Sequence, residues 1–143
     1  MALIVKKFGG SSVGNIDKIK AVAKRILDEK QPDDKIVVVV SAMGDTTDDL
    51  IQLAKGITKD PYQYTREMDM LLTTGEQVSI SLLTMAFKAL GQKAISLTGA
   101  LAGVKTNSVH TKGKIKDIQP KRIFEELDKG NIVIVAGFQG CDD

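Results

Sequence analysis

A lysine stands directly before a pair of glycines near the start of the chain. Residues 7–14 read Lys-Phe-Gly-Gly-Ser-Ser-Val-Gly, which places a cation, a flexible bend and hydroxyl side chains close together. Backbone N–H groups in such a bend, with the positive end of a helix dipole behind them, form a site for an anion such as phosphate. The pattern therefore predicts phosphate binding, with the Lys7 ammonium reaching an oxyanion that lies over the bend.

The common nucleotide-binding fingerprints do not explain this segment. Gly9 and Gly14 have the spacing of a P-loop, but Asn15 stands where that motif requires lysine, and no Gly-x-Gly-x-x-Gly occurs. An ordinary strand-to-helix turn with a solvated lysine has the same spacing. The residues alone leave both interpretations open.

Strands and helices alternate around this bend. Short apolar, β-branched runs predict buried strands at 3–8, 36–40, 94–97 and 132–136. Helical periodicity and capping residues predict helices that follow Asn15, span 50–54, run from Thr74 to about Leu90, and run from Pro120 to Lys129. Residues 99–113 have no clean period and are interpreted as irregular or hairpin structure.

This alternation predicts an α/β fold, a three-layer αβα sandwich with a mostly parallel sheet that is incomplete at its C-terminal side. In such folds ligands gather at the carboxyl ends of the strands. Those ends are residues 9–12, 41–44 and 137–140. We therefore expect the site to be built from these three loops.

The helix expected at 74–90 has two unusual features. Thr74 and Gln77 match a capping box, in which both side chains satisfy free N–H groups at a helix start. Apolar residues occur on nearly all of its sides, so it is either buried centrally or packed against another subunit. We favour burial.

Bulk composition limits the class of protein. A chain of 143 residues with 43% hydrophobic positions supports one domain, and its net charge of +2 is interspersed, which disfavours nucleic acid as a partner. The apolar runs are far shorter than the ~20 residues that span a bilayer, so no membrane contact is expected. A single cysteine, Cys141, and the absence of a leader before the first strand favour the cytoplasm. A lone His110 argues against a serine-histidine-acid triad, and no metal site is expected.

Four segments together resemble the aspartate kinases. Residues 7–13 resemble the opening signature of that family, and 40–48, 67–76 and 136–140 resemble its second, third and fourth loops in order. The likeness covers essentially the whole chain. It implies that residues 1–143 are the N-terminal part of an amino-acid-kinase domain.

The resemblance implies a role for each matching residue. ATP phosphates would be bound by Lys7, Phe8, Gly9, Gly10, Ser11 and Ser41, and Lys7 would also act catalytically on the phosphoryl group in flight. The aspartate substrate would be bound by Asp45, Thr46, Thr47, Asp48, Asp49 and Glu76, with Glu76 meeting its α-ammonium. Competing interpretations remain, because Glu76 would also suit a helix start, and Asp48 and Asp49 would suit a solvated loop.

The implied reaction moves the γ-phosphoryl group of ATP, with Mg²⁺ bound through the nucleotide, to the side-chain carboxylate of L-aspartate. This is the first step of lysine, threonine and methionine biosynthesis. A carboxylate with a pKa near ~4 is already ionised at pH 7, so no general base is needed. Positioning and charge neutralisation would carry catalysis. The whole enzyme is expected to be a homo-oligomer.

The chain also departs from the family. Relatives continue beyond the fourth loop into a further nucleotide-site segment and C-terminal ACT domains, which are absent from this sequence. We therefore expect the 143 residues to be inactive alone. Lys112 and Lys114 stand in a segment where relatives often have Asn-Ala-Arg, which leaves any role of His110 open.

Two alternatives stay open, one within enzymes and one from a different class. Another enzyme with the amino-acid-kinase fold, such as a carbamate, glutamate or uridylate kinase, would share the lysine and glycine loop but lack the Ser-Ala-Met-Gly and Thr-Gly-Glu segments. A non-catalytic binding or assembly module would instead dock its exposed sheet edge and apolar helix on a second polypeptide.

Overall fold

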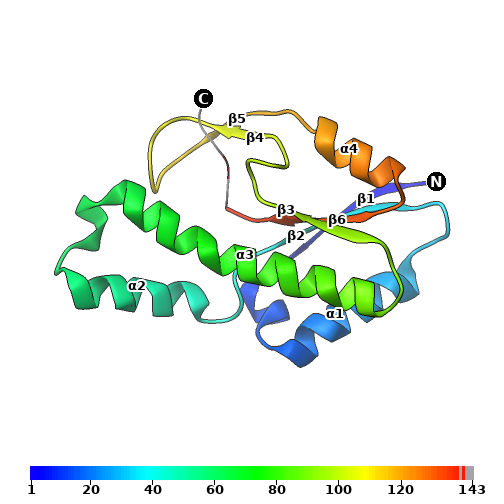
Figure 1. The fold of residues 1–143 in the computed structure, drawn as a ribbon, viewed down its shortest axis with the longest axis horizontal. Helices are drawn as coiled ribbons and strands as arrows, with labels where there is room; N and C mark the ends of the chain where they lie inside the picture. Colours follow the sequence, from blue (N-terminus) through cyan, green and yellow to red (C-terminus); the bar gives the residue numbers. More distant parts are fainter. Residues whose placement is uncertain (139, 141–143) are drawn as a thin grey trace.

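The structure, a computed structural model of the chain, describes residues 1–138 and residue 140. Strands and helices alternate along most of this length, as Figure 1 shows. In chain order the elements are β1 (Leu3–Phe8), η1 (Gly10–Val13), α1 (Ile16–Glu29), β2 (Lys35–Val40), α2 (Thr46–Ile57), η2 (Pro61–Gln63), α3 (Thr65–Ala89), β3 (Ala94–Leu97), β4 (Val104–Thr106), β5 (Ile115–Ile118), α4 (Lys121–Asp128) and β6 (Ile132–Ala136).

A four-stranded sheet with the order β1-β2-β6-β3 lies at the centre of the molecule. All three neighbouring pairs are parallel, with Phe8 beside Val40 and Val40 beside Ala136 at their carboxyl ends. The predicted α/β fold with a mostly parallel sheet is therefore confirmed, and the carboxyl ends of β1, β2 and β6 meet at one edge.

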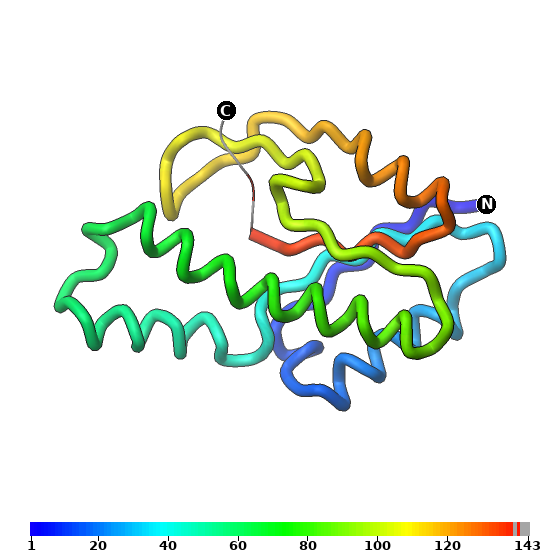
Figure 2. The backbone as a smooth tube through the Cα atoms, viewed as in Figure 1, coloured from blue at the N-terminus to red at the C-terminus, as the bar shows by residue number. Residues whose placement is uncertain are grey.

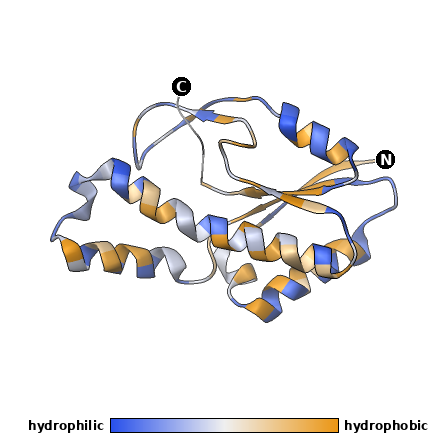
Figure 3. Cartoon of the chain, viewed as in Figure 1, coloured by the Kyte–Doolittle hydropathy of each residue, from blue (hydrophilic) through white to orange (hydrophobic). Residues whose placement is uncertain are grey.

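Alternate residues of the strands serve two separate cores. One core packs Val38, Ile134 and their neighbours against α1 and α3, and the other packs Val37, Val133 and Val135 against α4. Figure 3 shows the central strands as hydrophobic along their length. Because both faces of the sheet are covered there, the middle strands β2 and β6 are apolar runs, whereas the edge strand β1 alternates between exposed and half-buried residues.

The first helix begins as its sequence predicts. The Asn15 side chain accepts a hydrogen bond from the Lys18 amide at 2.9 Å, and Ile19, Val22 and Ile26 are buried at helical spacing. The turn η1 lies between the glycine bend and α1. The α1 N-terminus is thus capped by its own residue and is set apart from the bend.

The predicted start of the long helix at Thr74 is wrong. Helix α3 begins nine residues earlier, at Thr65, and the Thr74 hydroxyl donates to the Leu71 carbonyl at 2.6 Å inside the helix. Residues 65–73 contain no proline or glycine to stop the helix from extending. The predicted burial holds for one face, which includes Leu83 and Phe87, whereas Met85 and Leu90 are exposed.

Helix α2 is also longer than predicted. It spans Thr46–Ile57, whereas the sequence predicted residues 50–54, so it begins four residues earlier and ends three residues later. The hairpin expectation for residues 99–113 is confirmed in outline, because β4 and β5 form an antiparallel pair. Figure 2 shows their connecting loop folding back toward the N-terminal half of α3.

Candidate functional site

Main-chain hydrogen bonds join the loops that follow β1, β2 and β6. The Ser41 amide donates to the Phe8 carbonyl at 3.3 Å, and the Gly44 amide donates to the Gly10 carbonyl at 3.0 Å. On the other side of β2, the Gly137 amide donates to the Val40 carbonyl at 2.8 Å. The three loops that the sequence singled out are therefore held side by side by the parallel sheet.

The two glycines of the first bend have different roles in packing. A Cβ at Gly10 would lie 2.8 Å from the Ala42 carbonyl oxygen, whereas a Cβ at Gly9 would meet nothing within 4 Å. The close approach of the first two loops therefore requires glycine at position 10. At Gly9 the open space lies on the solvent side of the bend.

An open cavity of about 720 Å³ lies beside these loops, at the carboxyl end of the sheet. Val5, Lys7 and Val39 line it from the sheet, and Gly137 and Phe138 line it from the loop after β6. Its other walls are the N-terminal half of α3 and the loop 106–113. The cavity therefore spans the layers of the sandwich.

Strand alternation gives the two adjacent lysines opposite surroundings. Lys6 forms an ion pair with Glu29 of α1, and Glu29 also accepts from Arg25 at 2.9 Å. Hydrogen bonds from Lys6 and Arg25 lower the pKa of the Glu29 carboxyl to about 2. Lys7 points to the other face, into the cavity, with its Nζ 5.8 Å from the centre of the Phe138 ring.

Lys7 is thus the cation of this cavity. In the part of the chain that the structure describes, no carboxylate lies within 4.0 Å of its Nζ. An exposed ammonium on a rigid strand, not neutralised by a neighbouring acid, is suited to bind a ligand oxyanion.

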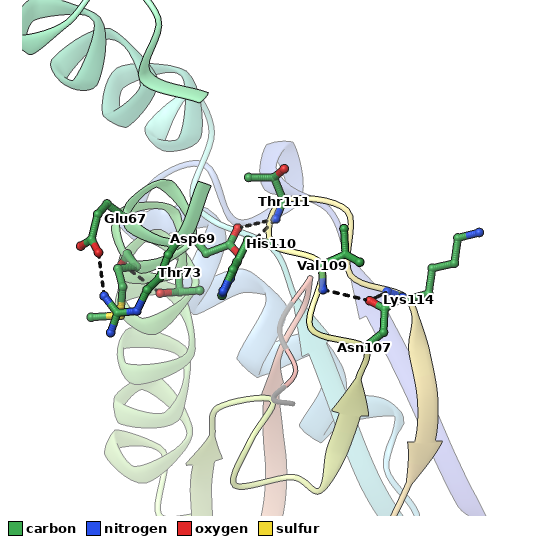
Figure 4. Close-up of polar contacts among 10 residues, drawn as sticks. Glu67, Asp69, Thr73, Asn107, Val109, His110, Thr111 and Lys114 are labelled. Carbon is green, nitrogen blue, oxygen red and sulfur yellow. Dashed lines mark hydrogen bonds and ion pairs between the residues drawn. The ribbon is translucent and has the colours of Figure 1, made fainter. Parts of the chain in front are cut away.

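The opposite wall of the cavity is held by Asp69. Its Oδ2 lies 2.8 Å from His110 Nδ1, and its two oxygens accept from the Thr111 amide at 3.0 and 3.1 Å. Figure 4 shows Asp69 pointing from α3 toward His110 and Thr111, and Glu67 pointing elsewhere. One carboxylate therefore connects α3 with the β4–β5 loop.

Three polar residues form a stripe along α3. Asp69, Thr73 and Glu76 follow the spacing i, i+4 and i+7, which places them on one face of the helix. Asp69 and Thr73 line the cavity, and Glu76 is 8% exposed. The sequence predicted a role for Glu76 alone. A helix predicted from Thr65 would have placed Asp69 and Thr73 on the same face as Glu76 and so indicated them as well.

The residues predicted to bind aspartate lie on α2 and α3. Asp45 precedes α2, and Asp48 and Asp49 are exposed in its first turn. Thr46 reaches α3, since its Cγ2 would be 3.4 Å from a Cβ at Gly75, next to Glu76. Thr47 is half-buried. None of these residues lines the cavity that contains Lys7.

The residues predicted to bind phosphate are only partly brought together. Lys7 lines the cavity, whereas Gly9, Gly10, Ser11 and Ser41 lie in the neighbouring loops outside its lining. The Phe8 side chain packs in the core beneath α1 and α3, so only its main chain faces this edge. Gln139, in the fourth family segment, and Cys141 lie outside the described residues.

The described residues contain no group of three or more His, Cys, Asp or Glu side chains arranged to hold a metal ion. No helix in the same residues is long and apolar enough to cross a membrane. What the arrangement offers is a fixed cation, main-chain loops and a polar helix face around an open cavity, which suits binding an anionic substrate.

A parallel sheet, a lysine at the end of its first strand and a glycine bend after it define a class of protein. The model of the amino acid kinase family matches residues 2–143, and the chain belongs to that family.

Relatives that the chain resembles along its whole length are aspartate kinases. The chain is 54% identical over its whole length to aspartokinase 2 of Bacillus subtilis, of which it covers 35%. The crystal structure of aspartate kinase from Synechocystis matches 96% of the chain and 22% of that protein, at 50% identity and a TM-score of 0.78. Escherichia coli aspartokinase III, in complex with aspartate and ADP, covers the whole chain with a TM-score of 0.80 at 19% identity, which supports the fold. The chain thus spans about a third of the length of the curated relative, and the expected resemblance to aspartate kinases is confirmed.

Proposed function

We propose that the chain forms the N-terminal part of the catalytic domain of an aspartate kinase, which transfers the γ-phosphoryl group of ATP to the side-chain carboxylate of L-aspartate. The products are ADP and 4-phospho-L-aspartate. Two comparisons support this proposal. The chain is more than 50% identical to an aspartokinase along its whole length, and a structural relative forms a complex with aspartate and ADP.

The orientation of Lys7 carries this proposal. Its side chain enters the cavity at the carboxyl end of the sheet, where α/β folds bind their ligands, while Lys6 pairs with Glu29 on the other face. A cation at this point can offset charge on the three equatorial oxygens of the phosphoryl group as it moves. Main-chain N–H groups around Gly9, Gly10, Ser11 and Ser41 would hold the remaining phosphates.

The reaction needs little acid–base chemistry. An aspartate carboxylate is ionised at neutral pH and attacks the γ-phosphorus directly. One oxygen–phosphorus bond forms to the substrate as the bond to the bridging oxygen of ADP breaks, and the electron pair stays on ADP. Mg²⁺ would enter bound to the nucleotide phosphates, as is usual for this ion in phosphoryl transfer.

The acceptor would lie between α2 and α3. Glu76 would meet the α-ammonium, and its burial on the face of α3 that also carries Asp69 and Thr73 supports this role. Thr46 and Thr47 would contact the substrate beside it, whereas Asp45, Asp48 and Asp49 would act from the exposed start of α2. All the residues predicted from the sequence to bind aspartate would therefore contribute to the acceptor site.

The proposal also covers the cellular location, the assembly and the pathway of the whole protein. The whole protein would act in the cytoplasm as a homo-oligomer, in the biosynthesis of lysine, threonine and methionine. The 143 residues alone would be inactive, since the relatives are about three times as long. The complete kinase that contains this segment is therefore the material for activity measurements.

Replacing Lys7 tests the proposal most directly. In the complete kinase, Lys7→Ala should lower kcat by about 100-fold or more, because one preorganised charge at a transferred group contributes several kcal/mol. Aspartate-dependent ADP release measures the rate, with glutamate, carbamate and UMP as competing acceptors.

The neighbouring Lys6→Ala is the matched control, because Lys6 pairs with Glu29 away from the cavity. It should leave kcat within about threefold. Turnover of Lys7→Ala within about threefold of wild type, a loss under ~1 kcal/mol, would refute the role of Lys7 in the transition state.

A further inference from the structure

In the described part of the chain, Asp69 attaches the loop between β4 and β5 to helix α3. Among the described residues, the hydrogen bonds that leave residues 107–114 for an element outside the hairpin all end on Asp69. Residues 108–119 are exposed, so apolar burial adds little to this attachment. The position of the loop therefore depends mainly on a single carboxylate.

The loop is preorganised internally but not placed by its own contacts. The Asn107 side chain accepts from the amides of Val109 and Lys114 at 3.4 and 3.1 Å, and the Asn107 amide donates to the Lys114 carbonyl at 3.0 Å. Figure 4 shows these contacts at the base of the loop, apart from Asp69. They close the loop on itself and leave its tip to Asp69.

The tip carries an unfavourable backbone conformation. Thr111 has φ 63°, in the left-handed region that a β-branched residue rarely adopts. Such a residue persists where the surroundings hold it, and such residues cluster at binding and active sites. Here the Thr111 amide is the group that Asp69 binds, so the strained residue and its restraint are in direct contact.

We infer that Asp69 is a positioning residue for the acceptor substrate: its carboxylate fixes the 107–114 loop, and with it the cavity wall opposite Lys7. Asp69 does not touch the reacting atoms in this assignment. Asp69 lies on the same face of α3 as Glu76, and it lines the cavity together with Lys7 and the 107–114 loop, so the loop that it holds would border an acceptor bound between Glu76 and Lys7. The inference rests on the proposed aspartate kinase function.

The kinetic consequence distinguishes positioning from folding. If the loop is released, the acceptor loses contacts that it makes equally before and during phosphoryl transfer, which raises KM and spares kcat. A merely structural role would lower the fraction of active enzyme, which lowers the apparent kcat and leaves KM unchanged.

In the complete kinase, Asp69→Ala should raise the KM for aspartate about tenfold, as expected for loss of charge-assisted hydrogen bonds, with kcat changed less than threefold. Asp69→Asn keeps one acceptor oxygen for the Thr111 amide and should raise that KM only about threefold. Glu67→Gln is the control, because Glu67 is an exposed acid on α3 that pairs with Arg66. It should change neither constant.

Amide hydrogen exchange at Thr111 supplies a readout that needs no activity. Exchange should be slow in wild type and Glu67→Gln, and faster in both Asp69 variants. His110→Ala should raise the KM for aspartate in wild type and add nothing in Asp69→Ala, because the two residues act through one contact.

The results separate the two levels of the proposal. An unchanged KM in both Asp69 variants, or a fall in kcat alone, overturns the positioning role. An unchanged rate of amide exchange at Thr111 overturns the positioning role as well. Asp69→Asn supplies this measurement if Asp69→Ala does not fold. Wild-type kinase that turns over no aspartate would instead refute the proposed function.

Discussion

Two walls of one cavity are built in different ways. On the sheet side, Lys7, Val39 and the loop after β6 line the cavity, and main-chain hydrogen bonds and the absence of a side chain at Gly10 hold the adjoining loops after β1 and β2. On the opposite side, the 107–114 loop is placed by the side chain of Asp69 and holds Thr111 in a left-handed conformation. The first wall is fixed by the fold itself, and the second by one tertiary contact.

The two walls therefore differ in rigidity: the sheet-side wall is fixed, and the wall formed by the 107–114 loop is adjustable. Main-chain bonds between parallel strands break only when the sheet does, so Lys7 has the rigidity that electrostatic catalysis requires. A loop held by one exposed carboxylate opens at far lower free energy. Under the proposed function, the rigid wall would hold the phosphate and the adjustable wall would admit the acceptor.

Adding a methyl group at Gly10 should break the sheet-side wall and have the largest effect on stability. Gly10→Ala places a Cβ 2.8 Å from the Ala42 carbonyl oxygen, where backbone must move. We expect the free energy of unfolding to fall by about 2 kcal/mol. Chemical denaturation of the protein measures this change.

Gly9→Ala is the matched control. Nothing lies within 4 Å of its Cβ, and its φ of −78° suits any residue. Its stability should equal or slightly exceed that of wild type, because alanine restricts the unfolded chain. Equal losses in both variants would show that tight contact between the loops does not place this wall.

Relieving the backbone strain at Thr111 should stabilise the cavity wall formed by the 107–114 loop. Asparagine tolerates φ 63° better than a β-branched residue, so Thr111→Asn should raise the free energy of unfolding by about 0.5 kcal/mol. Ser108→Asn, in the same loop but without a positive φ, should have no such effect. A loss of stability in Thr111→Asn alone would mean that the threonine side chain, and not the backbone conformation, matters here.

The smallest expected effect concerns the ion pair that braces β1 beside Lys7. Hydrogen bonds from Lys6 and Arg25 lower the pKa of Glu29 from 4.5 to about 2. A lowered pKa means that the contribution of Glu29 to stability is fully present above pH 4.5 and is lost as the pH falls toward 2. Thermal unfolding should show a shallower loss between these pH values in Glu29→Gln than in wild type.

Glu125→Gln provides the comparison, because Glu125 is an acid on α4 whose ion pair with Lys121 is long, at 3.8 Å. It should keep the wild-type slope. Identical slopes in wild type and Glu29→Gln would contradict the bracing role of this pair.

Much of the fold was predictable because its signals are local. The apolar run 36–40 and the cap at Asn15 are complete within a few residues, and both are confirmed. The predicted start at Thr74 was wrong because a capping pattern also occurs inside helices. Gly75 lies inside α3, where a Cβ would come within 3.0 Å of the Ala42 side chain, so the absence of that atom lets the helix pack against the loop after β2.

The site was predictable on one side only. Lys7 and the three strand-end loops follow from strand order and chain direction, which the sequence indicates. The contact of Asp69 with His110 joins residues 41 positions apart, through a hairpin whose placement depends on tertiary structure. No local pattern encodes such a contact, and the roles of the individual binding residues stay predictions.

Helix α3 runs continuously from Thr65 to Ala89, so it behaves as a stiff rod with Phe87 in the core and Asp69 at the cavity wall. These residues are roughly 27 Å apart along its axis, and a tilt of about 2° at one end displaces the other by about 1 Å. That displacement exceeds the tolerance of a hydrogen bond. A cavity created around Phe87 would therefore break the contact between Asp69 and the hairpin, although no residue of that contact is changed.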